Sequence, residues 1–281
     1  MVKQFKNKQK MKKKNLLMTA IAIFGLATIT MAQSVPSYVP TNGLVGWWPF
    51  NGNANDESGN GNNGTVNGAT LTADRFGYAN KAYDFNSNNN TYIQAGIGIQ
   101  DTLTFSAWFK CGGPTTYYGM IYSYGDASVT GSTYSGQIMG PHPIWVSASH
   151  VGKFHPYAFN NGYLSEIIPT QYSDDNNWHN VIVTYIPNDK IYFYYDGVFI
   201  IHSALNAFSI TQGIVTFGRD LNNNAGLTND QGKFNGKIDD IGIWNRALTQ
   251  QEITDLYNTN TVGINEPLQG KLFSVFPNPA Q

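Results

Sequence analysis

Residues 236–257 read GKIDDIGIWNRALTQQEITDLY, and this stretch places a strand pattern directly before a helix pattern. Lys237 to Trp244 is dense in isoleucine and ends in an aromatic residue, which favours a β-strand. Thr249 to Glu252 has the form of a capping box, in which Thr249 caps the helix and Glu252 reaches back to it. A short apolar face follows at Ile253, Leu256 and Tyr257. We therefore predict a last strand followed by one short helix.

Strand patterns dominate the rest of the chain, and helical periodicity is nearly absent after residue 32. In residues 102–110 (TLTFSAWFK) the side chains alternate with period two, as in a strand with two different faces. One face presents Leu103, Phe105, Ala107 and Phe109. Further strand patterns occupy 43–50, 81–85, 92–95, 120–124, 178–185, 190–195, 198–202 and 214–218. Many short strands separated by Gly and Asn turns predict an all-β fold, a two-sheet antiparallel jelly-roll sandwich.

The composition narrows the class of protein. Only 12% of the 281 residues are charged and the net charge is −1, so no basic face for nucleic acid is expected. Asn, Gly, Thr, Ser and Tyr supply the polarity instead, which is typical of an extracellular β protein. The single cysteine, Cys111, has no partner for an internal disulfide and is interpreted as a small buried apolar residue.

The N-terminal residues indicate export. Lysines crowd the first 14 residues, 16–31 are apolar, and small residues precede Gln33, so we interpret 1–32 as a secretory signal peptide. Met11 is an alternative start, because the residues after it form a complete signal by themselves. A transmembrane anchor is the rival interpretation, but the apolar run falls short of the roughly 20 residues that span a bilayer. Roughly 250 residues remain, which suits one large β domain or two small ones.

Three blocks of the sequence together resemble the laminin-G-like domain of the concanavalin A-like lectin/glucanase superfamily. They are GLVGWWPFNGNANDESGNGNNGTVNGA with KAYDFN (43–69 and 81–86), WHNVIVTY with KIYFYYDGV (178–185 and 190–198), and the stretch 236–257. The resemblance implies a jelly roll of two packed sheets over residues 42–260, preceded by a linker at 33–41.

The C-terminal residues resemble a second family. FSVFPNPA, within 272–281, is similar to the start of the sorting domain read by the type IX secretion machinery, and a linker at 261–271 leads into it. This resemblance implies that the chain continues beyond Gln281 and that the protein is secreted or held on the outer surface of a Gram-negative bacterium. The alternative is an exposed, Pro-rich linker.

The stretch NGNANDESGNGNNGTVNG (51–68) directly follows the aromatic run of the first strand pattern. Its glycines allow close approach of backbone carbonyls, and its Asn and Asp side chains offer oxygen ligands, the donors that Ca²⁺ prefers. In the resembled family a calcium commonly lies where this loop meets the last strand. The implied ligands are Asp56, Asp239 and Asp240, with loop oxygens near Ser58, Gly59 and Asn62. The alternative is that Asp56 caps an Asx turn and Asp239 pairs with an arginine, such as Arg246.

No motif for catalysis is found. The paired carboxylates of a glycosidase are missing as a local run, and Glu166, the only mid-domain glutamate, has no acidic neighbour in sequence. The five histidines form no metal motif, and no G-x-S-x-G occurs. The sequence therefore favours a protein that is not an enzyme.

Aromatic residues point to ligand binding. Those in strand patterns are interpreted first as core: Trp47, Trp48, Phe50, Phe85, Phe105, Trp108, Trp178 and Trp244. The stretch 115–165 differs, because it is rich in Gly, Ser, Thr and aromatic residues and matches none of the three blocks. We interpret it as an insertion whose rings either stack on sugars or pack over a sheet. The candidate ligand-binding residues are Tyr118, Tyr124, Trp145, His150 and Tyr157.

Three functions remain open at this point. The first is an exported, non-catalytic module that binds carbohydrate or a surface glycoprotein and holds a structural Ca²⁺. The second is a structural or adhesive surface domain that contacts proteins. The third is a glycoside hydrolase, which would need Glu166. The expected partners are therefore glycans or glycoproteins together with the type IX secretion machinery, and nucleic acid is not among them.

Overall fold

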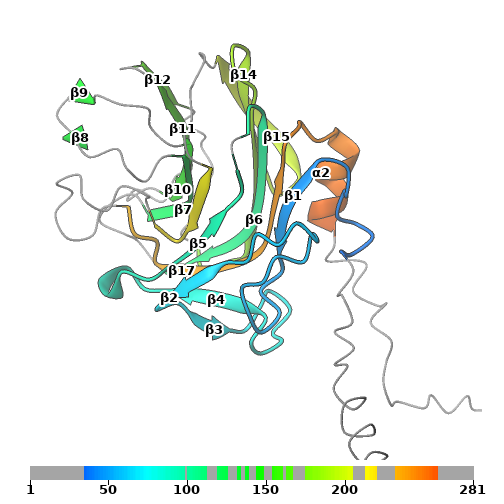
Figure 1. Ribbon diagram of the computed structural model, residues 1–281, viewed down its shortest axis with the longest axis vertical. Helices are drawn as coiled ribbons and strands as arrows, with labels where there is room; N and C mark the ends of the chain where they lie inside the picture. The colour runs from blue at the N-terminus through cyan, green and yellow to red at the C-terminus, as the bar shows by residue number, and fades with distance from the viewer. Residues whose placement is uncertain are drawn as a thin grey trace, which may run out of the picture. The chain divides into compact units, whose positions relative to one another are not determined.

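Figure 1 shows a computed structural model of the chain. The structure describes residues 35–98, 100–112, 119–125, 132–133, 137–138, 144–148, 154–160, 163–166, 175–204, 213–219 and 232–258. The predicted signal peptide, the linker at 261–271 and the predicted sorting segment at 272–281 lie outside these residues. Within them, no helix has the length and apolar character that crossing a bilayer requires.

The first sheet has eight strands. Along it lie β15 (Val198–Ala204), β14 (Lys190–Tyr195), β13 (His179–Tyr185), β6 (Leu103–Cys111), β17 (Gly236–Trp244), β4 (Ala82–Phe85) and β3 (Thr70–Thr72), and β1 (Leu44–Trp48) also pairs with β17. Neighbouring strands run antiparallel. Except for β3, which was not predicted, the strand patterns predicted for these segments are confirmed to within about two residues at their ends.

The second sheet has seven strands and lies against the first (Figure 1). Its order is β12 (Tyr163–Glu166), β11 (Phe154–Asn160), β10 (Ile144–Ala148), β7 (Gly119–Gly125), β16 (Ile214–Phe217), β5 (Tyr92–Gly96) and β2 (Thr65–Asn67). A separate pair joins β8 (Ser132–Thr133) to β9 (Gln137–Ile138), and one turn of 3₁₀ helix, η1, spans Ser87–Asn89. The predicted two-sheet antiparallel sandwich is confirmed.

The core between the sheets is aromatic. The four residues predicted to share one face of β6 (Leu103, Phe105, Ala107 and Phe109) are buried there. Phe105 stacks on Tyr122 of the other sheet, with ring centroids 3.4 Å apart, and the Tyr122 hydroxyl donates to the Tyr185 hydroxyl over 3.0 Å. A buried hydroxyl must find such a partner, so this bond lets a tyrosine serve as core. Cys111 is buried in the same cluster, as interpreted.

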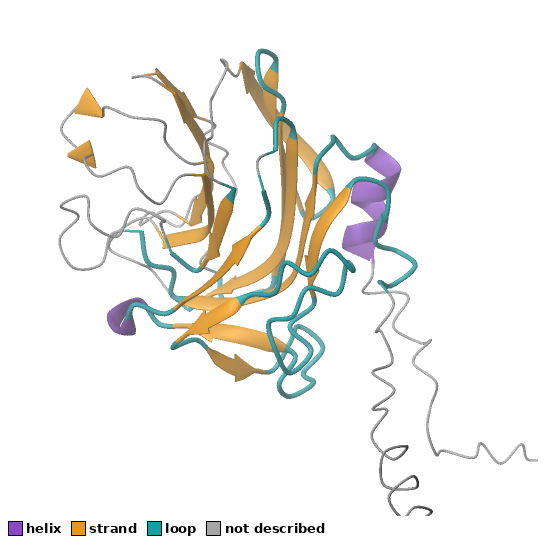
Figure 2. Ribbon diagram, viewed as in Figure 1, coloured by secondary structure: helices purple, strands orange, loops and turns teal. Residues whose placement is uncertain are grey.

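Helix α2 (Gln250–Tyr257) covers the other face of the eight-stranded sheet, as Figure 2 shows. The capping box is confirmed: Thr249 accepts from the backbone of Glu252, and Glu252 accepts from the backbone of Thr249. Ile253 and Leu256 are buried in one cluster with side chains of the sheet, of the N-terminal segment and of the link from β17 to α2, namely Trp47, Ile182, Trp244, Val39 and Leu248. Full burial of each such aliphatic side chain stabilises by about 1.5–3 kcal/mol.

Two sequence interpretations need correction. The segment 33–41 is not only a linker, because Val39 is 2% exposed beneath α2 and the Pro40 carbonyl accepts from Trp244 Nε1 over 2.7 Å. The stretch 115–165 is not an added insertion, because it supplies β7, β10, β11 and β12 of the seven-stranded sheet. The pattern at 120–124 predicted β7, but the sequence analysis found no pattern for β10, β11 and β12.

Candidate functional site

Asp56 organises residues 51–68, which we call the Asn/Gly loop, through hydrogen bonds to its buried carboxylate. Its carboxylate accepts from the backbone N–H groups of Trp47 (3.0 Å), Ser58 (2.9 Å) and Asn62 (2.9 Å). The Ser58 bond closes the predicted Asx turn. Because the carboxylate is only 9% exposed and uses both oxygens, it fixes the loop against β1.

Asparagine amides of the same loop complete the hydrogen bonding of β1. Asn60 Nδ2 donates to the carbonyls of Leu44 (2.9 Å) and Val45 (3.0 Å), and Asn62 Nδ2 donates to Val45 (2.8 Å). In return, the Asn62 carbonyl accepts from Trp48 Nε1 over 3.0 Å. The amides therefore supply donors to the carbonyls of two consecutive residues of β1. This explains why so polar a stretch lies beside the aromatic run of β1.

Arg75 joins the β3–β4 hairpin to the last strand. Its Nη1 donates to Asp240 Oδ2 at 2.6 Å and to Asp239 Oδ2 at 3.2 Å, and the arginine side chain is 5% exposed. The guanidinium also lies over the rings of Phe76 (4.4 Å) and Trp108 (4.7 Å). We call Arg75, Asp239 and Asp240 the arginine clasp.

The clasp depends on an irregularity in β17. Pairing between β17 and β6 shifts register between Asp239 and Gly242, and Asp240 has a φ of +44°. A positive φ is costly for a residue other than glycine, so the contacts of the clasp must hold it. Burial raises the pKa of both carboxyls, and the guanidinium of Arg75 opposes that rise.

The carboxylates predicted as metal ligands all have partners within the chain. Asp56 uses both oxygens on N–H groups, while Asp239 and Asp240 contact a cation that the chain itself supplies. Among the described residues, no group of three or more His, Cys, Asp or Glu side chains is placed to hold a metal ion. One observation points the other way: Glu57 Oε2 is buried without a hydrogen-bond partner. Burial, with Asp240 and Asp56 nearby, raises the pKa of Glu57 to about 7.

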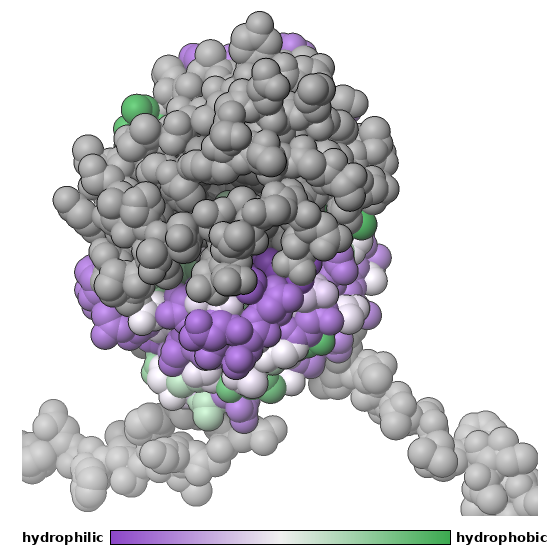
Figure 3. Space-filling view, turned by 90° about the vertical axis from the view of Figure 1, so that its left-hand side faces the viewer, coloured by the Kyte–Doolittle hydropathy of each residue, from purple (hydrophilic) through white to green (hydrophobic). Residues whose placement is uncertain are grey.

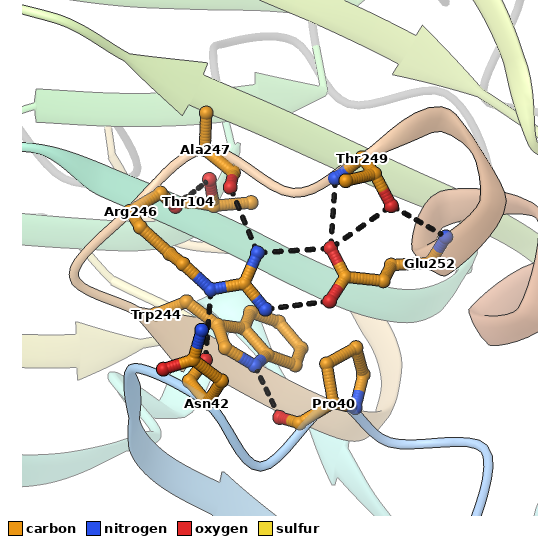
Figure 4. A network of polar contacts seen from close by, with 8 residues as sticks. All are labelled: Pro40, Asn42, Thr104, Trp244, Arg246, Ala247, Thr249 and Glu252. Carbon is orange, nitrogen blue, oxygen red and sulfur yellow. Dashed lines mark hydrogen bonds and ion pairs between the residues drawn. The ribbon is translucent and has the colours of Figure 1, made fainter.

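The arginine suggested for Asp239 was the wrong one. Arg246 instead pairs with Glu252, at 2.6 Å from Nη2 to Oε1 and 2.9 Å from Nη1 to Oε2, as Figure 4 shows. Arg246 Nε also donates to the Asn42 carbonyl over 2.9 Å. This network ties the N-terminal segment and the end of β17 to the capped end of α2. Arg246 therefore stabilises the helix and is not available to the clasp.

A histidine flanked by two carboxylates was not found by sequence analysis. His179 lies 2.8 Å through Nδ1 from Asp196 Oδ2 and 2.9 Å through Nε2 from Asp175 Oδ1, and its ring stacks on Tyr195. Burial lowers the pKa of His179, but the hydrogen bonds to Asp196 and Asp175 outweigh it, so the net pKa is raised. The three residues come from different strands and turns, so no motif marks them.

The structure places the candidate ligand-binding residues in different surroundings. Tyr118 and His150 lie outside the described residues. Tyr124 is fully buried in the core, where its hydroxyl donates to the Gly98 carbonyl (3.0 Å), so it is a packing residue rather than an exposed ring. Trp145 in β10 and Tyr157 in β11 are direct register partners.

A row of register partners crosses the whole seven-stranded sheet at this point. Its members are Thr65, Gln94, Thr216, Ser123, Trp145, Tyr157 and Glu166. Directly opposed residues of antiparallel strands share one face. Phe217 and Tyr122, the sequence neighbours of Thr216 and Ser123, lie in the core, so the backbone register assigns the row to the face turned away from the eight-stranded sheet. Ser123 and Thr216 are themselves buried, at 0% and 1% exposed. We call this row the outer row.

The described surface beside β5 and β2, at one edge of the seven-stranded sheet, is polar. Figure 3 shows a mostly hydrophilic area below the grey atoms, on the side of the molecule where η1 lies. The residues of η1 are Ser and Asn, and none of them is buried. Beside it, the guanidinium of Arg219 lies 4.0 Å over the Tyr92 ring. This part of the surface is rich in amide and hydroxyl groups rather than in net charge.

Two antiparallel sheets around an aromatic core, with a helix covering the outer face of one sheet, define a jelly-roll β-sandwich. A sequence profile of the concanavalin A-like lectin/glucanases superfamily, of the laminin G type, matches residues 84–254. This match covers more than half of the chain, so the protein belongs to that superfamily. No curated protein matches the chain.

Three solved structures illustrate the likeness in fold. The binding domain of Paraclostridial mosquitocidal protein 1 superposes with a TM-score of 0.60 at 19% identity, over 78% of this chain and 53% of that one. The binding domain of botulinum neurotoxin DC, solved with rat synaptotagmin II, superposes with a TM-score of 0.57 at 13% identity, over 78% of this chain and 52% of that one. This chain therefore spans about half the length of the toxin domains.

The third structure is matched along nearly its whole length. It is domain 4 of AbnA, an extracellular arabinanase of family GH43 from Geobacillus stearothermophilus, solved with arabinotriose. The TM-score is 0.55 at 16% identity, over 76% of this chain and 98% of that one. At these identities the likeness concerns the fold, and the fold is that of binding domains in proteins of very different activity.

Proposed function

We propose that this chain is a non-catalytic module that binds carbohydrate, free or carried by a glycoprotein, at the outer row of the seven-stranded sheet. The observation that carries the proposal is the direct pairing of Trp145 with Tyr157. Two aromatic residues paired on one sheet face match the flat apolar faces of consecutive sugar rings. The same fold in an arabinotriose-bound domain supports this assignment.

The test is a glycan array followed by titration with the retained glycan. Trp145→Ala and Tyr157→Ala should each weaken binding about tenfold or more, and the melting temperature of each variant is measured beside its affinity. Phe199→Ala is the matched control, because Phe199 is an aromatic residue, 44% exposed, on the edge strand of the other sheet. A full-length protein that retains no glycan would overturn the proposal.

Protein recognition is the second candidate function. It is favoured by the neurotoxin binding domain of the same fold that was solved with synaptotagmin II. Binding to a surface protein that persists after enzymatic removal of its glycans would support this candidate over the first. The hydrolase alternative predicts release of reducing sugar that is lost in Glu166→Gln.

We propose calcium as a separable part of the function, held where the Asn/Gly loop meets β17. The support is Glu57 Oε2, a buried oxygen that lies near Asp240 and has no hydrogen-bond partner. This ligand differs from Asp56 and Asp239, which the family resemblance implied. A hard divalent cation takes such oxygens together with backbone carbonyls of a Gly-rich loop. A melting temperature that rises with added Ca²⁺ and falls with a chelator supports this site, and equal values argue against it.

We also propose that the protein is exported to the outer surface of a Gram-negative bacterium by the type IX secretion machinery. The residues that support this are the basic and apolar segments within 1–32 and the sequence FSVFPNPA near the C-terminus. The mature protein recovered from the medium or cell surface should begin at Gln33. Recovery of an intact N-terminus from the cell interior would contradict the proposal.

A further inference from the structure

The turn between β3 and β4 exposes two aromatic rings at its tip. Residues 76–80, FGYAN, are all exposed, with Phe76 at 46% and Tyr78 at 65%. A Cβ atom added at Gly77, between the two rings, would meet no atom within 4 Å. The tip therefore projects into open space: the Tyr78 ring is mostly exposed, and the Phe76 ring is about half exposed, with the Arg75 guanidinium 4.4 Å from its centroid. We call residues 76–80 the aromatic tip.

The backbone of the aromatic tip is held in one conformation. Asp74 Oδ1 accepts from the N–H groups of Phe76 (2.9 Å) and Tyr78 (2.8 Å). The backbone of Asp74 also pairs with the Tyr78 carbonyl (3.1 Å) and with the Gly77 N–H (3.2 Å). Exposed rings on a turn fixed by four hydrogen bonds lose little freedom when a ligand binds, which favours affinity.

The arginine clasp anchors the tip to the domain. Arg75 is the residue directly before Phe76, and its buried guanidinium contacts Asp239, Asp240 and the Phe76 ring. A charged side chain buried in a double ion pair cannot leave its position without a large cost. The neighbouring rings are thus placed by the core of the sheet and not by a mobile loop.

We infer that the aromatic tip is a second contact site for the sugar ligand, with Phe76 and Tyr78 as stacking rings. No residue of 76–80 is charged, so the site suits a neutral saccharide better than a phosphate, a charged peptide or an anionic lipid. The Asn80 amide and the Tyr78 hydroxyl supply the donors and acceptors that sugar hydroxyls need. This inference rests on the proposed carbohydrate-binding function and adds to it a ligand class and a second place of contact.

The experiment compares wild-type protein with the double variant Phe76→Ala/Tyr78→Ala on an array of neutral and acidic glycans. The neutral glycan retained by wild type should lose about tenfold or more in affinity. Phe76 also contacts the Arg75 guanidinium, so the single variant Tyr78→Ala is measured beside the double variant, and its melting temperature should agree with that of wild type within a few degrees. Phe199→Ala again controls for loss of an exposed ring elsewhere, and Asn80→Ala tests the polar contact without removing a ring.

The outcomes separate the two proposals. If wild type and the double variant bind equally to a glycan that Trp145→Ala releases, the inference about the tip is wrong and the proposed function stands. If wild type retains no glycan, the proposed function fails and the inference fails with it. If the double variant instead loses binding to neutral phosphatidylcholine vesicles and keeps its glycan, the tip contacts membranes and the inference is overturned.

Discussion

Arg75 Nη1 and Asp240 Oδ2 lie 2.6 Å apart, although 165 positions separate the two residues in the chain. The contact joins the β3–β4 turn to the last strand of the eight-stranded sheet, so an early and a late segment of the domain are locked together. Both residues are nearly inaccessible, with side chains 5% and 13% exposed. The sequence has a single cysteine and therefore no internal disulfide. This buried ion pair links two distant segments, as a disulfide does in many small exported domains.

Removing Arg75 should destabilise the domain strongly. Arg75→Ala leaves Asp239 and Asp240 buried without their cation, and loss of one partner of a buried pair costs about 3–5 kcal/mol. Urea unfolding of the variant measures this change. Arg246→Ala is the matched control, since the Arg246–Glu252 pair is about a quarter exposed and should contribute roughly 0–1 kcal/mol. Equal losses in the two variants would contradict the central role of the clasp.

Asp56→Ala should loosen the Asn/Gly loop before it affects the rest of the sandwich. The substitution leaves the N–H groups of Trp47, Ser58 and Asn62 without their charged acceptor, at a cost of roughly 3 kcal/mol. Amide hydrogen exchange should therefore accelerate at Ser58 and Asn62 while β6 stays protected. Asn88→Ala, an exposed change in η1, serves as the control. Unchanged exchange in the loop would show that other contacts hold it.

The sandwich could be predicted from local sequence because strand alternation and capping are local properties. In β6, Leu103 and Phe105 alternate with Thr104 and Ser106, and this period fixed the strand and its core face before any partner was known. Thr249 and Glu252 likewise marked the start of α2 from four residues. The strand β7 shows the limit. All seven of its residues are buried, so polar and apolar positions do not alternate, and Tyr124 was assigned to the surface instead of the core.

The contacts of the site could not be predicted in the same way. Arg75 meets Asp239 and Asp240 across 164 and 165 positions, and nothing near Arg75 in sequence marks its partner. The partner chosen from sequence, Arg246, is close along the chain, but its guanidinium is directed to the cap of α2 by Glu252. The pairing of Trp145 with Tyr157 also required the sheet register, which the local sequence of two separate strands does not specify.

The stability contributed by His179 should decrease as the pH rises. The folded-state pKa of His179 is raised above its unfolded value of 6.5, so the stabilisation is fully present below pH 6.5 and is lost as the pH rises through the folded pKa. The groups that face the ring are Asp175, Asp196, Tyr195 and Phe109. The difference in unfolding free energy between wild type and His179→Asn should shrink from pH 5.5 to pH 8.5, and a constant difference would contradict the charged pairing.

The helix cap should weaken in acid. Hydrogen bonds from Arg246 and the Thr249 backbone, against the opposing effect of burial, lower the pKa of Glu252 from 4.5 to about 2. Because the pKa of Glu252 is lower in the folded state than in the unfolded state, the ionised carboxylate stabilises the fold. This stabilisation is complete above the unfolded pKa of about 4.5 and is lost as the pH falls toward the folded pKa of about 2. Solvent screens a pair that is about a quarter exposed, so the loss should be near 1 kcal/mol. Glu252→Gln should remove most of this acid dependence while retaining a side-chain acceptor for the Thr249 N–H. Unfolding curves of the two proteins between pH 2 and pH 6 measure the difference, and parallel pH profiles would show that Glu252 does not titrate as the ion pair requires.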